Sequence, residues 1–474
     1  MTPVILWTDA LVFLLLAAGV AGAFLVRRRE DLLAAWQRVG ESRAGMASLA
    51  VLALFVCIGL LDSLHYRPRL EAAGGYGGEV LSALDRLLDP LRAGMEKTYS
   101  APLATHLYAR ETVELEGGGQ SRVFPRLLHG GAHLDNPERD WAGDVARRIA
   151  AGAAAAALAW LLLAGLATSA AARRWRCGWR PAWRRIWRGE TRLAWKALLL
   201  ALAALLLLGG PLVALAGGYH VFGTDKVGQD VLYLTLKSVR TGLVIGTLTT
   251  LAMLPLALAL GIVAGYFGGR IDDFIQYIYT TLNSIPAVLL IAAAVLMVQV
   301  AIDTHPGWFA TAAHRADARL LALCLILGVT SWTGLCRLLR AETLKLRELE
   351  YVQAAQAFGV SATRIMGRHI LPNVMHIVLI VVVMDFSGLV LAEAVLSYIG
   401  IGVDPSTISF GTMINTARLE LAREPVVWWS LLAAFVFMLA LVLAANLLAD
   451  AVRDAFDPRL ASRRVLPLAR EQVA

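Results

Sequence analysis

The sequence predicts an all-α integral membrane protein, and three observations lead to that prediction. Of its 474 residues, 58% are hydrophobic and only 17% are charged, with a mean hydropathy of +0.62, which does not fit a soluble globular domain. Several apolar runs approach the ~20 residues that a helix needs to cross the hydrocarbon core. The net charge of +8 gathers beside these runs, as topology signals do, and not on a soluble surface for nucleic acid.

Nine apolar runs are the expected membrane spans, since helices satisfy every backbone polar group within lipid. The runs are residues 4–26, 44–61, 149–172, 197–216, 242–266, 274–301, 320–335, 376–399 and 426–448. Basic residues cluster at 27–29, 173–196 and 337–368. Placing all three clusters in the cytoplasm gives a consistent alternation, with a periplasmic N-terminus and a cytoplasmic C-terminus.

Composition divides the chain into five parts. Two spans come first, followed by a long polar segment with glycine clusters, which we expect to be a small extracytoplasmic domain or an extended loop. A third span and a basic linker then lead into a core of six spans and a short cytoplasmic tail. The expected boundaries are 1–61, 62–148, 149–196, 197–460 and 461–474. The four cysteines fall in expected spans or in the basic linker, so no disulfide framework is implied.

Histidines in the polar segment raise the question of a metal site. His129 and His133 are four residues apart, with His106 and His65 elsewhere in the segment. This spacing is a weak signal, because the two glycines between His129 and His133 argue against a helix that would bring them together. We therefore expect no metal site, and the segment shows no nucleophile and base arrangement for catalysis.

Tryptophans and arginines alternate in the basic linker. The tryptophans are Trp175, Trp179, Trp183 and Trp187, and arginines fill most positions between them. At helical spacing this pattern makes one face aromatic and the others cationic, which suits a helix at the headgroup level of an anionic leaflet. We expect membrane lipids as its partner and expect Pro181 to break the helix in two.

The stretch from 350 to 373 is polar and lies between two long apolar runs, so we expect it outside the lipid. Residues 352–358 favour a short helix, and Gly359 provides a C-terminal stop. Ser361 can cap a second short helix, which we expect to end before Pro372 because a proline disfavours helix in the residue before it. The result would be two short helices at a bend, which is a docking surface.

This stretch resembles the EAA loop of ABC-importer permeases. The resemblance rests on the alanine pair, the glycine that follows it and a Leu-Pro pair twelve positions beyond that glycine. It implies that the residues coupling the chain to an ATPase are Gln353, Ala354, Ala355, Gly359, Leu371 and Pro372. Gln353 stands where most EAA loops have Glu, and His369 stands where most have Ile.

A second polar segment follows the fourth span and resembles the Gly-Thr-Asp-x-x-Gly-Arg-Asp-Val segment of dipeptide and oligopeptide permeases. The matching residues are Gly223, Thr224, Asp225, Gly228 and Asp230, with Gln229 in the place of Arg. Its glycines permit tight turns and its aspartates can cap helices. Similar family patterns occur at 265–269, 410–413 and 446–460, so the resemblance covers about 220–460.

Four residues are candidates for the translocation pathway. Asn283 and Pro286 interrupt an apolar run, and proline in a membrane helix frees backbone groups, so we favour a kinked, pore-lining helix, with a simple packing kink as the alternative. Asp385 and Glu393 are carboxylates within a span, where charge is costly and marks function. Glu393 matches a family pattern. Asp385 matches none, and either meets a cationic substrate or forms an internal hydrogen bond or ion pair.

The resemblance implies a type I ABC importer transmembrane domain, with an N-terminal extension of about three spans and an extracytoplasmic insertion. The chain would be the second, C-type permease of the dipeptide/oligopeptide/nickel group in the bacterial inner membrane. Its implied partners are a second permease, two ABC ATPases and a periplasmic solute-binding protein. The chain has no phosphate-binding G-x-x-x-x-G-K-[ST] loop, so ATP and Mg would sit on the partners and we expect no cofactor and no catalytic residue here.

Two other classes stay open at this point. A secondary transporter would need no ATPase and often shows discontinuous, repeated spans. A membrane scaffold built around the extracytoplasmic segment would need a binding surface there. The sequence does not name the cargo, which would be a peptide or a similar small solute.

Overall fold

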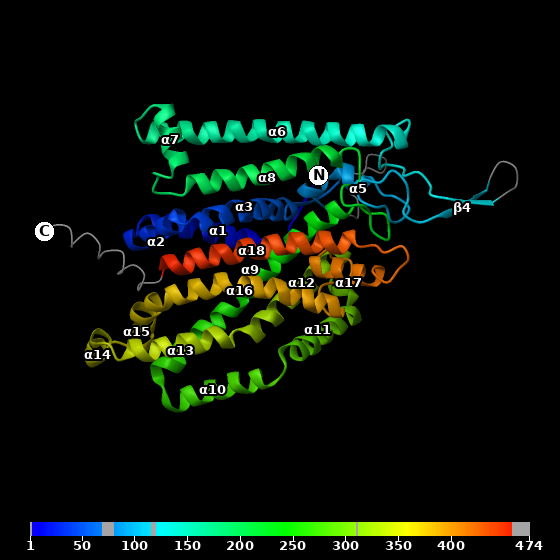
Figure 1. Cartoon of the computed structure of the whole chain (residues 1–474). Helices are drawn as coiled ribbons and strands as arrows, with labels where there is room; N and C mark the ends of the chain where they lie inside the picture. The colour runs from blue at the N-terminus through cyan, green and yellow to red at the C-terminus, as the bar shows by residue number, and fades with distance from the viewer. Residues whose placement is uncertain (1, 69–79, 115–119, 310, 457–474) are drawn as a thin grey trace. The chain divides into compact units, whose positions relative to one another are not determined.

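The computed structural model describes residues 2–68, 80–114, 120–309 and 311–456. Within these residues, eight helices are long and apolar enough to cross a membrane, or nine when two helices bent by 40° at Trp332 count as one span. The all-α membrane class is therefore confirmed (Figure 1). The expected C-terminal tail, 461–474, and the last four residues of the final family match, 457–460, lie outside the described residues.

The backbone divides into two compact units. The first comprises Met1–Val4, Val26–Thr241 and Ile408–Ala451, and the second comprises Ile5–Leu25, Gly242–Thr407 and Val452–Ala474. Two long helices, α9 (Val231–Phe267) and α18 (Trp429–Phe456), have residues in both units.

The first unit contains most of the N-terminal half of the chain. Its helices are α2 (Glu30–Glu41), α3 (Arg43–Asp62), α4 (Ala83–Leu87), α5 (Asp89–Ala93), α6 (Pro137–Arg174), α7 (Trp179–Arg188), α8 (Trp195–Ala216) and α17 (Phe410–Glu420). Its strands are β1 (Thr2–Val4), β2 (His65–Arg67), β3 (Leu81–Ser82), β4 (Glu111–Glu114) and β5 (Gln120–Val123). The first three strands form an antiparallel sheet in that order, and the last two form a hairpin.

Within this unit, α6 and α8 run side by side and α7 lies across one end of them (Figure 1). Gly152 and Gly210 permit the close approach, because a Cβ on Gly152 would lie 2.6 Å from the Gly210 carbonyl oxygen. Pro181 does not break α7, contrary to expectation, since it falls in the first turn, where a proline removes no helical hydrogen bond. The break comes earlier, between Arg174 and Trp179.

The second unit contains the remaining helices. They are α1 (Trp7–Arg27), α10 (Gly269–Ser284), α11 (Ala287–Thr304), the 3₁₀ turn η1 (Pro306–Trp308), α12 (Ala312–Ser331), α13 (Thr333–Arg347), α14 (Glu350–Ala357), α15 (Ala362–Ile365), the π-helical turn η2 (Met366–Ile370) and α16 (Leu371–Ile399). The first helix of the chain packs in this unit, where Leu11, Val12 and Leu15 contact a core formed by α9, α11, α12 and α16.

The expected span at 274–301 is wrong in its first half. The structure has two helices there, not one kinked helix, because α10 ends at Ser284 and α11 begins at Ala287. Ile285 is extended (φ −89°, ψ 131°), as expected for a residue that precedes a proline, and Pro286 is the N-cap of α11. Helix α11 alone has the length and composition of a span.

Candidate functional site

The bend predicted after residue 358 is present in the second unit. Helix α14 ends in a Schellman motif: Gly359 N–H donates to the Gln356 carbonyl (2.9 Å) and Val360 N–H to the Ala355 carbonyl (3.1 Å). Gly359 has φ +74°, a left-handed conformation that favours glycine. The first short helix and its stop are thus confirmed.

The second half of the bend differs from the prediction. Ser361 is the N-cap residue of α15, but its side chain makes no capping hydrogen bond. The helix does not end before Pro372 either, since α15, η2 and α16 follow one another without a gap. The π-helical turn at Met366–Ile370 leads into α16, and Pro372 directly follows it, where Leu371 N–H donates to the Met366 carbonyl and the regular α-helical ladder is already shifted. A single helical rod therefore runs from residue 362 to residue 399.

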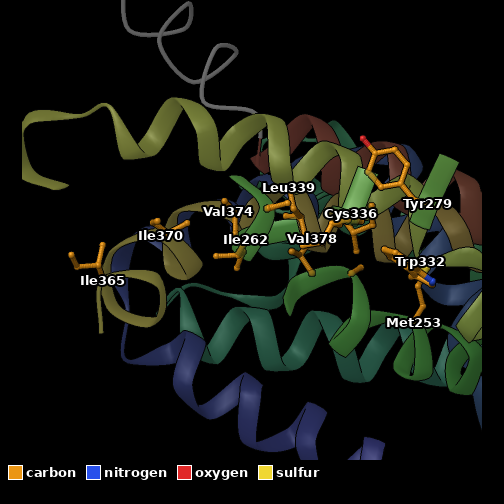
Figure 2. Packing of buried hydrophobic residues seen from close by; sticks show 14 of the residues in the cluster. Met253, Ile262, Tyr279, Trp332, Cys336, Leu339, Ile365, Ile370, Val374 and Val378 are labelled. Carbon is orange, nitrogen blue, oxygen red and sulfur yellow. The ribbon is translucent and has the colours of Figure 1, made fainter. Parts of the chain in front are cut away.

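Buried aliphatic side chains fix the base of the bend. Val352, Ile365 and Ile370 are each 0% exposed and join a cluster with Leu339 and Val374. Figure 2 shows Ile365 and Ile370 at one end of this row of side chains, with Trp332 at the other. The bend is therefore packed against α13 and α16 and is not a free loop.

Polar contacts tie the same region to the turn between α9 and α10. Gln356 Nε2 donates to the Tyr266 hydroxyl (3.3 Å), and Arg340 Nη2 donates to Asp272 Oδ2 (2.6 Å). Close backbone packing adds to this, because a Cβ on Gly265 would lie 2.6 Å from Thr343 Cβ of α13. These contacts make α9, α10 and α13 the immediate support of the bend.

The side of the bend away from this packed base is exposed. Gln353, Ala354, Gly359 and Pro372 are exposed, whereas Ala355 and Leu371 are partly buried, so the six expected coupling residues lie along one segment without forming a pocket. Sequence reasoning missed Phe358, which is 87% exposed at the tip. An apolar side chain placed directly before the helix stop, in a polar loop, was the signal.

The expected turns of the motif at 223–230, the polar segment after the fourth expected span, are present in the first unit. Gly223 (φ +71°) and Gly228 (φ +78°) are left-handed, and a Cβ on Gly228 would lie 1.8 Å from the Glu96 carbonyl oxygen. Thr224 Oγ1 accepts from the Ser100 N–H (2.7 Å). The motif is thus packed closely against the segment 96–100 of the insertion.

The two aspartates of the motif play different parts. Asp230 caps α9, as expected, by accepting from the N–H groups of Leu232 (2.8 Å) and Tyr233 (3.2 Å). Asp225 does not cap a helix. Its Oδ1 instead accepts from the N–H groups of Val227 (3.0 Å) and Gln229 (2.8 Å), and so closes a turn within the motif.

A buried charge network, which the sequence did not reveal, joins the motif to the insertion. His220 Nδ1 donates to Asp230 Oδ2 (2.7 Å) and Nε2 donates to Glu96 Oε1 (3.3 Å). Glu96 also accepts from the N–H groups of Leu128 (2.9 Å) and His129 (2.7 Å). Glu96 and His220 are 124 residues apart in sequence, so no local pattern could identify them as partners.

The network shifts the pKa of both groups. Burial alone would lower the pKa of His220, but its hydrogen bonds to Asp230 and Glu96 outweigh burial and raise the pKa to about 9. Burial alone would raise the pKa of Glu96, but the hydrogen bonds from His220 and from three backbone N–H groups lower it to about 2. Around neutral pH the site holds an imidazolium between two carboxylates.

A second polar cluster connects α9 to the end of α3. Lys237 Nζ donates to Asp62 Oδ1 (2.6 Å) and lies 3.0 Å from Asp85 Oδ1, and Tyr233 also donates to Asp85 (2.8 Å). Arg240 Nε donates to Ser63 Oγ (3.2 Å). The N-terminal extension and the insertion are thereby bonded to the first turns of α9.

The four pathway candidates are not brought together. Asn283 is exposed and accepts from Thr333 Oγ1 (3.1 Å), and Pro286 is exposed at the start of α11. Asp385 and Glu393 lie about 12 Å apart along the axis of α16, at ~1.5 Å rise per residue.

The two carboxylates of α16 have different surroundings. Glu393 is 1% exposed and accepts from Ser397 Oγ (2.6 Å), close to the turn that ends α16, which favours a local structural role. Asp385 is half-buried, and no hydrogen bond or ion pair joins it to another residue that the structure describes.

The histidines of the insertion make local contacts. His133 Nε2 lies 2.7 Å from Asp144 Oδ2, and His106 Nδ1 lies 3.0 Å from Thr105 Oγ1. Over the residues with described positions, no group of three or more His, Cys, Asp or Glu side chains is arranged to hold a metal ion.

These features define a class of protein: a helical membrane protein with several spans that presents a structured bend between two of them. Comparison with known proteins gives the family. The family model "Binding-protein-dependent transport system inner membrane component" matches residues 257–462. The chain belongs to this family, and it is a permease subunit of an ABC importer, not a secondary transporter or a scaffold.

Individual relatives agree with this assignment. The chain is 33% identical over 248 residues to the oligopeptide transport system permease protein OppC of Mycobacterium bovis, covering 52% of this chain and 79% of the relative. It is 30% identical over 241 residues to the dipeptide transport system permease protein DppC of Bacillus subtilis, covering 51% and 69%. For OppC of Haemophilus influenzae the identity is 28% over 242 residues, covering 51% and 71%.

Proposed function

We propose that the chain forms half of a translocation pathway for peptides, in the bacterial inner membrane, with a second permease as the other half. Two ABC ATPases would bind on the cytoplasmic side and a solute-binding protein would deliver cargo from the periplasm. The names of the similar proteins, oligopeptide and dipeptide permeases, support peptides as the cargo. The basic flanks support a periplasmic N-terminus and a cytoplasmic C-terminus.

One observation carries the proposal: the bend α14–Gly359–α15 has a buried base and an exposed tip. Val352 and Ile365 hold the base, while Phe358 at the tip is 87% exposed and available to a partner. An exposed aromatic side chain in a supported position is typical of a residue that anchors a protein interface. We assign this bend to ATPase docking through Gln353, Ala354, Ala355, Gly359, Leu371 and Pro372.

The continuous rod explains how movement would pass from the ATPase to the pathway. Because the helix runs without interruption from residue 362 to 399, a displacement at α15 moves α16, which carries Asp385. The ATPases can shift the population of the outward-open state only by the difference in their affinity for the two states. Asn283, Pro286 and Asp385 are proposed to line the pathway, with Glu393 holding the outer end of α16.

The coupling assignment can be tested with Gly359→Asp. We expect normal insertion and expression but loss of peptide uptake, because aspartate strains the left-handed position and places a negative charge on the docking face. The measurement is uptake of a labelled dipeptide by cells that carry the complete importer. No atom lies within 4 Å of the added Cβ, so the fold has space for the side chain.

The matched control is Gly334→Ala in α13, where a Cβ also meets no atom within 4 Å and φ is not positive. That variant should transport normally. Normal uptake by the Gly359→Asp variant, at equal expression, would contradict the assignment of this bend to coupling.

A further inference from the structure

Helix α7 carries an arginine face for which the protein itself supplies little counter-charge. It connects α6 and α8, both of which have the length and composition of membrane spans, so α7 lies at a membrane surface. The location of α7 at the membrane surface does not depend on which solute is transported.

The aromatic side of α7 is occupied by the protein. Ala182 and Ile186 are 0% exposed, and Ile186 packs with Ala164 of α6 and Leu199 of α8. The tryptophans take part in this packing: the ring centroids of Trp183 and Trp187 lie 5.5 Å apart, with neighbouring contacts to Trp179 and Trp160. The expected stripe therefore takes part in holding α7 on its own helices, while Trp179 stays 49% exposed.

The arginines of α7 point the other way. At roughly 100° of rotation per residue, Arg180, Arg184 and Arg188 fall on the side opposite Ala182 and Ile186, and Arg185 lies on the flank. All four are exposed, as are three more arginines just before the helix, Arg173, Arg174 and Arg176. Among the described residues, the only ion pair made by these seven arginines is Arg188 with Glu190, at 4.0 Å.

We propose that the arginine face of α7 binds the phosphate headgroups of anionic phospholipids in the adjoining leaflet. A guanidinium matches phosphate geometry with paired N–H donors, and it is weakly hydrated compared with an ammonium group. The membrane surface supplies anionic phosphates at the height where α6 ends and α8 begins, so the charges are complementary. The face thus anchors the α6–α8 pair by electrostatic contact.

The test uses the full-length chain in neutral detergent, titrated with short-chain phosphatidylglycerol and, separately, with phosphatidylcholine. We expect preferential binding of phosphatidylglycerol that weakens as salt is raised. The triple variant Arg180→Gln, Arg184→Gln, Arg188→Gln should lose about fivefold in affinity per arginine, and roughly a hundredfold in total. The double variant Arg180→Gln, Arg184→Gln should lose roughly 25-fold, which preserves a test if the triple variant does not fold.

The matched control removes the same charge elsewhere. Arg122, Arg139 and Lys226 are exposed, and changing all three to Gln should leave lipid binding unchanged. Inorganic phosphate at equal concentration should not displace the lipid. Equal affinity for the two lipids, unchanged phosphatidylglycerol binding in both arginine variants, or displacement by free phosphate would overturn the proposal.

Discussion

At the scale of single residues, His220 and Glu96 show how a charge network holds the insertion to the motif at 223–230. His220 is 4% exposed and Glu96 is 6% exposed, so their ion pair is closed to solvent. Local sequence predicted the turns at Gly223 and Gly228 and the cap at Asp230, because those depend on backbone geometry. It could not predict Glu96 or His220, since their pairing depends on tertiary structure.

This network makes the fold sensitive to pH in a defined direction. The folded pKa of His220 is about 9, above its ordinary 6.5, so its stabilisation is complete below pH 6.5 and is lost as the pH rises through 9. The folded pKa of Glu96 is about 2, below its ordinary 4.5, so its stabilisation is complete above pH 4.5 and is lost as the pH falls through 2. The melting temperature of the purified chain should therefore receive its largest contribution from this network between pH 4.5 and 6.5.

Replacing the imidazole tests the network directly. We expect His220→Ala to destabilise the first unit by roughly 3 kcal/mol, because two buried carboxylates lose their common partner. The control is His129→Ala, whose side chain is exposed while only its backbone N–H contacts Glu96. Hydrogen exchange at residues 128–130 should increase in the first variant alone. Equal exchange in both would show that His220 does not hold this segment.

Asp385 is the residue for which a functional prediction is most specific. It is half-buried in α16 without a hydrogen-bonding partner among the described residues, so a structural ion pair does not explain it. We expect Asp385→Asn to change the preference between cationic and neutral dipeptides while the complex assembles normally. Competition uptake assays measure the first effect and copurification of the ATPases the second. Loss of assembly with unchanged preference would assign Asp385 a structural role instead.

At the scale of helices, the three prolines that were misjudged share one cause. Pro181 lies in the first turn of α7, where proline is tolerated, Pro372 directly follows a π-helical turn, and Pro286 caps α11 after a complete break. The effect of a proline on a helix depends on how far it lies from the residue at which the helix begins. Tertiary packing determines where a helix begins or changes its geometry. The buried Ile370, for example, holds the π-helical turn against α13.

At the scale of the whole molecule, the chain combines a family core with additional structure. About half of the chain, 52%, aligns with OppC of Mycobacterium bovis. Composition predicted the membrane class and the approximate spans, because hydrophobicity alone decides whether a helix is stable in lipid. It did not predict that the extension would be bonded to α9 through Lys237 and Arg240, since these contacts join residues over 150 positions apart.

The central claim is that the bend at residue 359 faces the cytoplasm and contacts an ATPase there. The most direct test places a thiol at its tip, with Phe358→Cys in a chain whose exposed Cys57 and partly exposed Cys177 are changed to Ser. A membrane-impermeant maleimide should label the thiol in inverted vesicles and not in intact cells, and a thiol-directed crosslinker should join it to the ATPase subunit. Labelling from the outside of intact cells, or no crosslink in the assembled importer, would contradict the claim.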